Sequence, residues 1–536
     1  MSHSQLFHQL AKTLQIVHFC QKHHISTSEG MARISEWAAM MSVRKTQRRE
    51  FLANLGKFTL IGGTLGVGTG YFHRTLAAPI SPDAKIAIVG AGLAGLACAY
   101  ELQKKGIQAT IYEASQRAGG RCYSLENFFP GQVAERGGEF IDNLHKTMLG
   151  YANEFKLELE DLSKEPGDIF YYFNGQRYTE SAVVEEFRDF VSAMQSDLRN
   201  VGEPTADNFT SAERQLDLIN LQDYLDSRGA GNLIKQVIQA AYTGEYGREI
   251  NEQSCLSFLF LIHADKRSKF RPFGSSDERY HVIGGNQQIV KALENCVQNQ
   301  IKYGQKLLSA RKDSAGKIEL FFENSLSAKF DAVVFAIPFS TLRQVNLQGL
   351  QLPQWKLNAI NNFVYGTNSK LMVGFNSRPW RNFGSNGSAY ANLPFLQNTW
   401  ETNPSYATNN RAVLTDYTGG NLGASLNPKS LQQDTTNFLN NLSLVFPGAD
   451  IAAVKNSGNK YLAYLENWSL NPLNQGSYTC NQPGYFTSIA GNEGKAVDNI
   501  YFAGEHTNSF YEWQGFMEGA AISGVAAAKQ IVQAFK

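Results

Sequence analysis

The chain has 536 residues, of which 43% are apolar and 18% charged, the composition of an ordinary globular protein with about two to four domains. Its net charge of +1 is unevenly spread, because residues 1–78 carry nine Lys and Arg against three acids and leave the remainder near −5. This distribution gives no electrostatic basis for binding nucleic acid. The six cysteines are scattered without a CxxC pair, which argues against a metal site and against a disulfide framework.

The N-terminal part of the chain has the pattern of a twin-arginine export signal. Arg48 and Arg49 precede a glycine-rich apolar stretch at 58–72, and small residues follow at 76–79. The apolar stretch is too short to span a bilayer comfortably. We assign residues 41–78 to the signal; the alternative is a chance Arg-Arg pair before a surface helix. Residues 1–40 are a leader of uncertain status, either a long leader or a segment upstream of a true start at Met40 or Met41.

This pattern predicts where the protein is located. The twin-arginine export machinery carries folded cargo, which suits a protein that acquires a cofactor in the cytoplasm before export. We therefore expect a periplasmic or otherwise exported bacterial protein, with membrane association left open.

Residues 86–113 have the pattern of a strand, a tight turn, a helix and a second strand. Gly90 permits the turn, Gly92 lets the backbone approach a pyrophosphate, and Gly95 lets the helix pack closely on the strand. Glu113, at the tip of the second strand, can accept both hydroxyls of an adenosine ribose. Because a helix N-terminus attracts phosphates through its free N–H groups, we predict a dinucleotide site here.

The remaining elements alternate in a way that indicates an α/β fold. Residues 143–277 read as mostly helical, strands follow at 318–322 and 332–336, and aromatic-rich strands lie at 370–375, 412–418 and 461–468. A last strand near 499–503 and a helix from about Gly515 end the chain. We predict a doubly wound, Rossmann-like domain assembled from the discontinuous segments 83–150, 278–345 and 485–536. A substrate domain of mixed sheet and helices takes 151–277 and 346–484.

Four separated motifs carry a resemblance to a known family. They are VGAGLAGLACAYEL with Glu113, Gly-Gly-Arg at 119–121, YGTNSK at 365–370, and FAGEHT…GFMEGA at 502–520. Over residues 83–536 the chain resembles the flavin-containing amine oxidase superfamily, which includes monoamine oxidases, polyamine oxidases and L-amino-acid oxidases.

The resemblance implies a FAD site. Arg121 would lie along the diphosphate, and the final helix near Met517 would point its N-terminus at the flavin's pyrimidine edge. Monoamine oxidases attach flavin through a cysteine where this chain has Ser477, and Cys480 would need a register slip to serve, so we predict noncovalent FAD. The implied cofactor-binding residues are Gly90, Gly92, Ala94, Gly95, Glu113, Ala114, Arg121, Gly137, Gly138, Glu139, Gly504, Glu505, Phe516 and Met517.

The resemblance also implies the catalytic residues. Lys370 matches the family lysine that holds a water near the flavin's reactive nitrogen, although a lysine on a strand is usually just solvated. Tyr478 and Phe516 match the two walls of an aromatic cage that orients a neutral amine; core aromatics are the alternative reading. Further candidates for the substrate pocket are Phe140, Trp400 and Trp468.

One departure from the family concerns the substrate carboxylate. L-amino-acid oxidases have an arginine where this chain reads Gly137-Gly138-Glu139-Phe140. Either another arginine binds the carboxylate or the substrate has none; the candidates are Arg248, Arg378 and Arg381. Glu139 and Asp142 could instead favour a basic substrate, although acids near a turn are more often structural.

The implied reaction is oxidative deamination. A primary amine or L-amino acid would become an imine, which hydrolyses to ammonia and an aldehyde or 2-oxo acid, while O2 is reduced to hydrogen peroxide. Two alternatives stay open: a flavin dehydrogenase that passes electrons to quinone, and a noncatalytic FAD-binding protein. No metal is required, and a homodimer is one option for its assembly.

Overall fold

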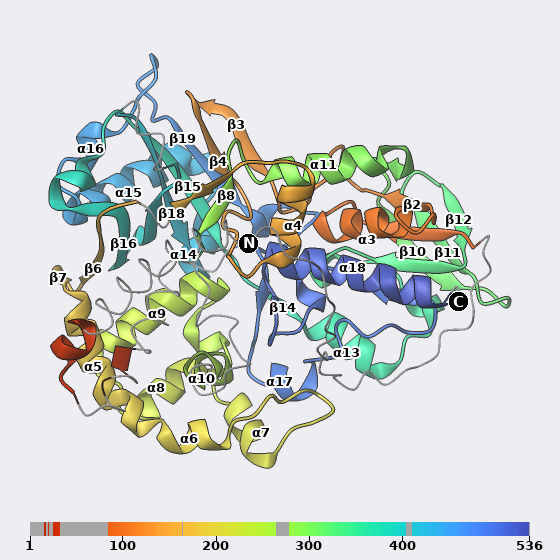
Figure 1. The fold of residues 1–536 in the computed structure, drawn as a ribbon, viewed down its shortest axis with the longest axis horizontal. Helices are drawn as coiled ribbons and strands as arrows, with labels where there is room; N and C mark the ends of the chain where they lie inside the picture. The colour runs from red at the N-terminus through yellow and green to blue at the C-terminus, as the bar shows by residue number, and fades with distance from the viewer. Residues whose placement is uncertain are drawn as a thin grey trace, which may run out of the picture.

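The computed structural model describes residues 16–17, 20, 25–32, 84–162, 165–263, 278–403 and 410–534. A five-stranded parallel sheet forms the centre of one domain (Figure 1). Its strands come from three separated parts of the sequence, so the predicted assembly of an α/β domain from discontinuous segments is confirmed. In spatial order they are β21 (Ile500–Phe502), β13 (Ala332–Phe335), β1 (Ile86–Val89), β2 (Ala109–Tyr112) and β9 (Ile301–Lys302).

Both faces of this sheet are buried, as expected for parallel strands. Ile86 and Ile88 of β1 pack with the helices α3 (Leu93–Gln103), α11 (Gln287–Val297) and α18 (Met517–Ala534). On the other face Tyr112 stacks on Phe322 with ring centroids 4.3 Å apart. Phe322 belongs to an antiparallel sheet that the sequence did not predict as a unit: β10 (Leu307–Lys312), β11 (Ile318–Phe322) and β12 (Ser327–Phe330).

A seven-stranded mixed sheet forms the second domain. Its order is β19 (Ala463–Asn467), β15 (Ser369–Phe375), β18 (Ala412–Thr418), β17 (Leu396–Glu401), β16 (Ser385–Leu393), β6 (Asp168–Phe173) and β7 (Gln176–Tyr178). The expectation that residues 143–277 are mostly helical is wrong for β6 and β7, and for β5 (Leu159–Asp161), which pairs with β8 (Tyr280–Val282). β5 and β6 are stabilised by partners more than 100 residues away, which local patterns do not reveal, and β7 pairs with β6 in a hairpin at the edge of the sheet.

The described residues between 179 and 263 are mostly helical and lie beside the mixed sheet (Figure 1). The stretch at 181–198 forms α5 (Glu180–Ala193) and α6 (Gln195–Asn200), and the apolar run at 255–262 lies in α10 (Cys255–His263). Between them lie α7 (Ser211–Asp217), α8 (Leu221–Ser227) and α9 (Asn232–Tyr246). The Thr179 hydroxyl caps α5 by accepting from the backbone N–H of Ala182.

Part of the segment assigned to a leader packs on α5, where Figure 1 shows it in red. Val17 and Cys20 are fully buried in the same core as α5. Arg188 of α5 donates to the Thr27 hydroxyl at 2.5 Å and to the Ile25 carbonyl at 3.1 Å. Residues 16–17, 20 and 25–32 therefore contact the substrate domain, whereas the predicted signal at 41–78 lies outside the described residues. Within the described part of the chain, no helix is long and apolar enough to cross a membrane.

Candidate active site

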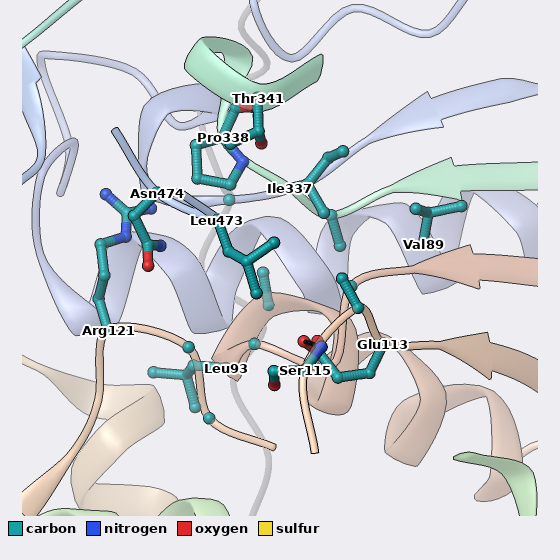
Figure 2. A pocket seen from close by; sticks show the side chains of 18 of the residues that line it. Val89, Leu93, Glu113, Ser115, Arg121, Ile337, Pro338, Thr341, Leu473 and Asn474 are labelled. Carbon is teal, nitrogen blue, oxygen red and sulfur yellow. Dashed lines mark hydrogen bonds between the residues drawn. The ribbon is translucent and has the colours of Figure 1, made fainter. Parts of the chain in front are cut away.

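A cavity of about 300 Å³ opens at the carboxyl ends of the parallel strands. Figure 2 shows Glu113 and Arg121 on opposite sides of it, with Leu473 between them. Most of the predicted cofactor residues line this cavity: Gly90, Gly92, Ala94, Glu113, Ala114, Arg121, Gly504, Glu505, Phe516 and Met517. The other four, Gly95, Gly137, Gly138 and Glu139, lie outside its lining.

The glycine-rich turn has the geometry that a phosphate needs. Gly90 adopts a positive φ of 104°, and a Cβ there would lie 2.7 Å from the Ala336 carbonyl oxygen. Gly95 lies behind the cavity wall, where α3 packs on β1. A Cβ at this position would lie 2.0 Å from the Gly90 carbonyl oxygen, so only glycine allows this close packing. Gly92 is the N-cap residue of α3, and no side chain of the described residues accepts a hydrogen bond from the first backbone N–H groups of the helix. A Cβ added to Gly92 would meet no atom within 4 Å. The N-terminus of α3 is therefore open to a ligand phosphate.

Glu113 is held at the tip of β2. One carboxylate oxygen accepts from the backbone N–H of Ala91 and the other from that of Ser115, both at 2.8 Å. Each oxygen keeps a second acceptor position for a ribose hydroxyl. Together with the α3 N-terminus, this arrangement fits the adenosine diphosphate part of FAD.

Arg121 and Glu505 form an ion pair at the other side of the cavity. The guanidinium donates to the Glu505 carboxylate and to the Ser477 carbonyl oxygen, both at 2.8 Å. Burial alone would raise the pKa of Glu505, but Arg121 and the Thr479 hydroxyl outweigh burial and hold that pKa below its usual value. Glu505 therefore anchors Arg121 at the cavity wall as a charged group.

Lys370 lies on β15 and is buried. Its ammonium group donates to the Glu135 carbonyl at 3.1 Å, to the Gly137 carbonyl at 2.9 Å and to the Glu139 carboxylate at 2.5 Å. These acceptors match the three hydrogens of an ammonium group. Each hydrogen of the ammonium group therefore has a protein acceptor, and the water expected at Lys370 stays a prediction.

Glu139 is fully buried between two donors. One oxygen accepts from Lys370, and the other accepts from the Trp400 indole N–H at 2.9 Å. Asp142 accepts from the backbone N–H of Leu144 at 2.7 Å and so shapes the turn before α4 (Lys146–Glu154). The interpretation that these acids select a basic substrate is not supported, because Lys370 neutralises Glu139 and Asp142 has a structural partner.

Aromatic rings gather beside the Lys370 ammonium. Phe140, Trp400, Tyr417 and Tyr478 form one buried cluster, in which the Trp400 ring lies 5.6 Å from Phe140 and 5.3 Å from Tyr417. Tyr478 donates its hydroxyl hydrogen to the Glu245 carbonyl and therefore accepts from Tyr417 at 2.8 Å. Burial raises the pKa of Tyr478 well above its usual value.

Tyr417 was missed by the sequence reasoning. It is the cross-strand neighbour of Lys370 in the pairing of β15 with β18. The strand at 412–418 was predicted, but its partner could not be, so no local signal placed Tyr417 at the site.

Two predicted aromatic residues lie elsewhere. Phe516 lines the cavity and packs edge-on against His145 and Trp513 at 5.2 and 5.3 Å. Its pairing with Tyr478 as a cage stays a prediction. Trp468 donates to the Arg136 carbonyl at 2.9 Å, outside the aromatic cluster, so its assignment to the substrate pocket is not supported.

The three candidate arginines are each engaged with an acid. Arg248 donates to Glu252 at 2.9 Å, Arg378 to Glu401 at 2.5 Å, and Arg381 to Glu165 at 3.3 Å. These contacts give all three arginines a structural role and favour a substrate without a carboxylate.

Comparisons with known proteins agree with this geometry. Residues 93–532 match the family model described as flavin containing amine oxidoreductase. YobN of Bacillus subtilis (strain 168), whose name gives L-amino-acid oxidase as a provisional activity, is 27% identical over 83% of this chain and 94% of its own. The L-amino-acid oxidase of Protobothrops flavoviridis is 22% identical over 84% of this chain and 89% of its own. Cyclohexylamine oxidase from Brevibacterium oxydans IH-35A shares the fold, with a TM-score of 0.72 and 20% sequence identity. The match covers 84% of this chain and 99% of that oxidase. The chain therefore belongs to the flavin containing amine oxidoreductase family and is an FAD-dependent amine oxidase.

Proposed function

We propose that this FAD-dependent amine oxidase acts on a neutral primary amine with an aromatic or apolar side chain. The observation that carries the proposal is the buried cluster of Phe140, Trp400, Tyr417 and Tyr478 beside Lys370. FAD held by the N-terminus of α3, Glu113 and Arg121 would supply two-electron oxidation: a hydride would leave the α-carbon of the amine, and its two electrons, together with two protons, would reduce O2 to hydrogen peroxide.

The side chains of the site suit a neutral amine. Lys370 and Glu139 cancel each other's charge, so this pair offers no unpaired acid to bind an ammonium ion. The aromatic rings exclude water and orient the amine nitrogen through their faces. Because only the deprotonated amine has a free lone pair, turnover should rise with pH as the substrate loses its proton.

We also propose that FAD is held noncovalently. The Ser477 hydroxyl donates to the Asn368 side chain at 2.6 Å and is fully buried. Burial raises the pKa of the Cys480 thiol to about 12, so it carries almost no thiolate at neutral pH. Denaturation with trichloroacetic acid should release all flavin into the supernatant, whereas flavin remaining in the pellet would contradict this proposal.

An L-amino acid is the second candidate substrate. Its support comes from relatives named L-amino-acid oxidase that match more than four fifths of the chain. Against it stand the ion pairs of Arg248, Arg378 and Arg381.

Matched substrates separate the two candidates. Anaerobic reduction of the bound flavin should be faster with 2-phenylethylamine than with L-phenylalanine, which differs from it only by the carboxylate. The reverse order would favour the amino acid. One peroxide formed per amine consumed in air distinguishes an oxidase from a dehydrogenase, and a flavin that no amine reduces would overturn the proposed function.

A further inference from the structure

We propose that Glu139 is the positioning residue of Lys370, which it holds as an immobile cation behind the cofactor cavity. This inference rests on the proposed function and deepens it. Lys370 then acts on the flavin through its charge, and neither carries a water nor relays a proton.

The first support is that Glu139 must be a carboxylate. It accepts from Lys370 with one oxygen and from the Trp400 indole N–H with the other. Both partners can only donate. A glutamine side chain would satisfy one of them and set its own N–H₂ group against the other, so the site needs an acceptor at both positions.

The second support is that the backbone around Glu139 is fixed. Asn286, which is fully buried, donates its side-chain amide to the carbonyl oxygens of Gly138 at 3.1 Å and Glu139 at 2.6 Å. The backbone N–H of Asn286 donates to the Glu135 carboxylate at 2.7 Å. The carbonyls of this same segment, at Glu135 and Gly137, accept the other two hydrogens of the lysine. One preorganised turn therefore provides all three acceptors.

The third support is the place of this turn against the cavity. A Cβ on Gly138 would lie 2.6 Å from the Met517 sulfur, and one on Gly137 would lie 1.6 Å from the Arg121 carbonyl oxygen. Arg121 and Met517 both line the cofactor cavity. The ammonium group bonded to the Gly137 carbonyl thus lies just behind the cavity wall, within reach of the cofactor's field.

Other charged or titratable groups also face Lys370. Burial raises the pKa of the Glu135 carboxyl to about 7, so below that pH the group is mostly uncharged and is a poor counter-ion. Glu466, the cross-strand neighbour on β19, bonds to Arg136 instead. Tyr417 offers the face of its ring at 5.9 Å from the lysine nitrogen. Of these groups, Glu139 has the carboxylate that bonds directly to the ammonium.

The test measures the midpoint potential of bound flavin between about pH 6 and pH 10, a range that includes the titration of a buried lysine. Three variants accompany the wild type: Glu139→Gln, Lys370→Met and, as a matched control, Glu466→Gln. The wild-type and Lys370→Met potentials should run parallel, separated by the constant effect of one positive charge. The Glu139→Gln potential should lie above the wild type at low pH, because the charge of the lysine is no longer opposed, and should fall towards the wild type at high pH as the unpaired ammonium loses its proton. Glu466→Gln should follow the wild type.

Two results would overturn the inference. One is a Glu139→Gln curve that stays parallel to the wild type; the other is a wild-type curve that itself converges on Lys370→Met. Because the flavin is reduced chemically, the measurement does not depend on the substrate. If no amine reduces the flavin, the proposed function fails while the potentials still decide the role of Glu139.

Discussion

Replacing Gly92 by alanine should separate cofactor binding from folding. Gly92 has φ −68° and ψ 176°, a conformation that alanine adopts without strain, and its Cβ would meet no protein atom within 4 Å. The free energy of unfolding of the apoprotein should therefore change by less than about 1 kcal/mol. The new methyl group would, however, point into the cavity at the N-terminus of α3.

The loss of affinity follows from the lost phosphate contact. A hydrogen bond from a backbone N–H to a charged phosphate contributes about 1.5–3 kcal/mol. Losing one such bond should raise the dissociation constant of FAD about tenfold to a hundredfold. Titration of the apoprotein with FAD, followed by quenching of flavin fluorescence, measures this constant.

Gly95→Ala is the contrasting variant. Its Cβ would lie 2.0 Å from the Gly90 carbonyl oxygen, so α3 must move away from β1. Overpacking costs about 1–3 kcal/mol, only partly offset by about 1 kcal/mol of better helix propensity. Urea unfolding should show the apoprotein destabilised by Gly95→Ala and not by Gly92→Ala. If Gly92→Ala bound FAD as tightly as the wild type, or unfolded as easily as Gly95→Ala, the assignment of this turn to the phosphates would be refuted.

Three further predictions concern stability and are read by urea unfolding. Lys370→Met should lower the free energy of unfolding by about 3–5 kcal/mol, because the buried Glu139 carboxylate loses its counter-ion; adding Glu139→Leu should recover most of the loss, and a double variant as unstable as the single one would contradict this. Burial raises the pKa of Glu493 from 4.5 to about 7, so its stabilising contribution is complete below about pH 4.5 and is lost as the pH rises to about 7, a fall of about 3 kcal/mol. Glu493→Gln should remove that slope, and an unchanged slope would assign it to another group. Thr27→Ala should cost about 1–2 kcal/mol, because Thr27 is buried against Arg188, whereas Ser28→Ala, at an exposed neighbour, should cost less than about 0.5 kcal/mol; equal effects would mean that residues 16–17, 20 and 25–32 do not pack as described.

Local patterns in the sequence were enough to predict the cofactor half of the site. The turn from Gly90 to Gly95 and the acid Glu113 lie within one strand-helix-strand unit, so their spacing alone encodes their geometry. The substrate half depends on contacts between distant segments. Lys370 meets Glu139 across 231 positions and Tyr417 across the pairing of β15 with β18, and neither contact leaves a local signal. The family motif identified Lys370 but not its partners, and the water expected at Lys370 stays a prediction.

The export signal and the domain bounds are predictions from the sequence. The twin-arginine motif at Arg48 and Arg49 lies outside the described residues, and export through that machinery rests on the sequence pattern alone. The domain bounds stay predictions too, although β1, β13 and β21 lie in the three segments assigned to the nucleotide domain.

The packing of residues 16–17, 20 and 25–32 on α5 bears on the cleavage that a twin-arginine signal would entail. These residues precede the twin-arginine motif, whereas the cavity and the aromatic cluster follow it. A signal peptidase that cut near Ala78 would produce two polypeptides, and the shorter one would be retained only by contacts such as those of Val17, Thr27 and Arg188. Loss of that fragment would uncover an apolar patch on the substrate domain, so the cut would convert a covalent part of the enzyme into a dissociable subunit.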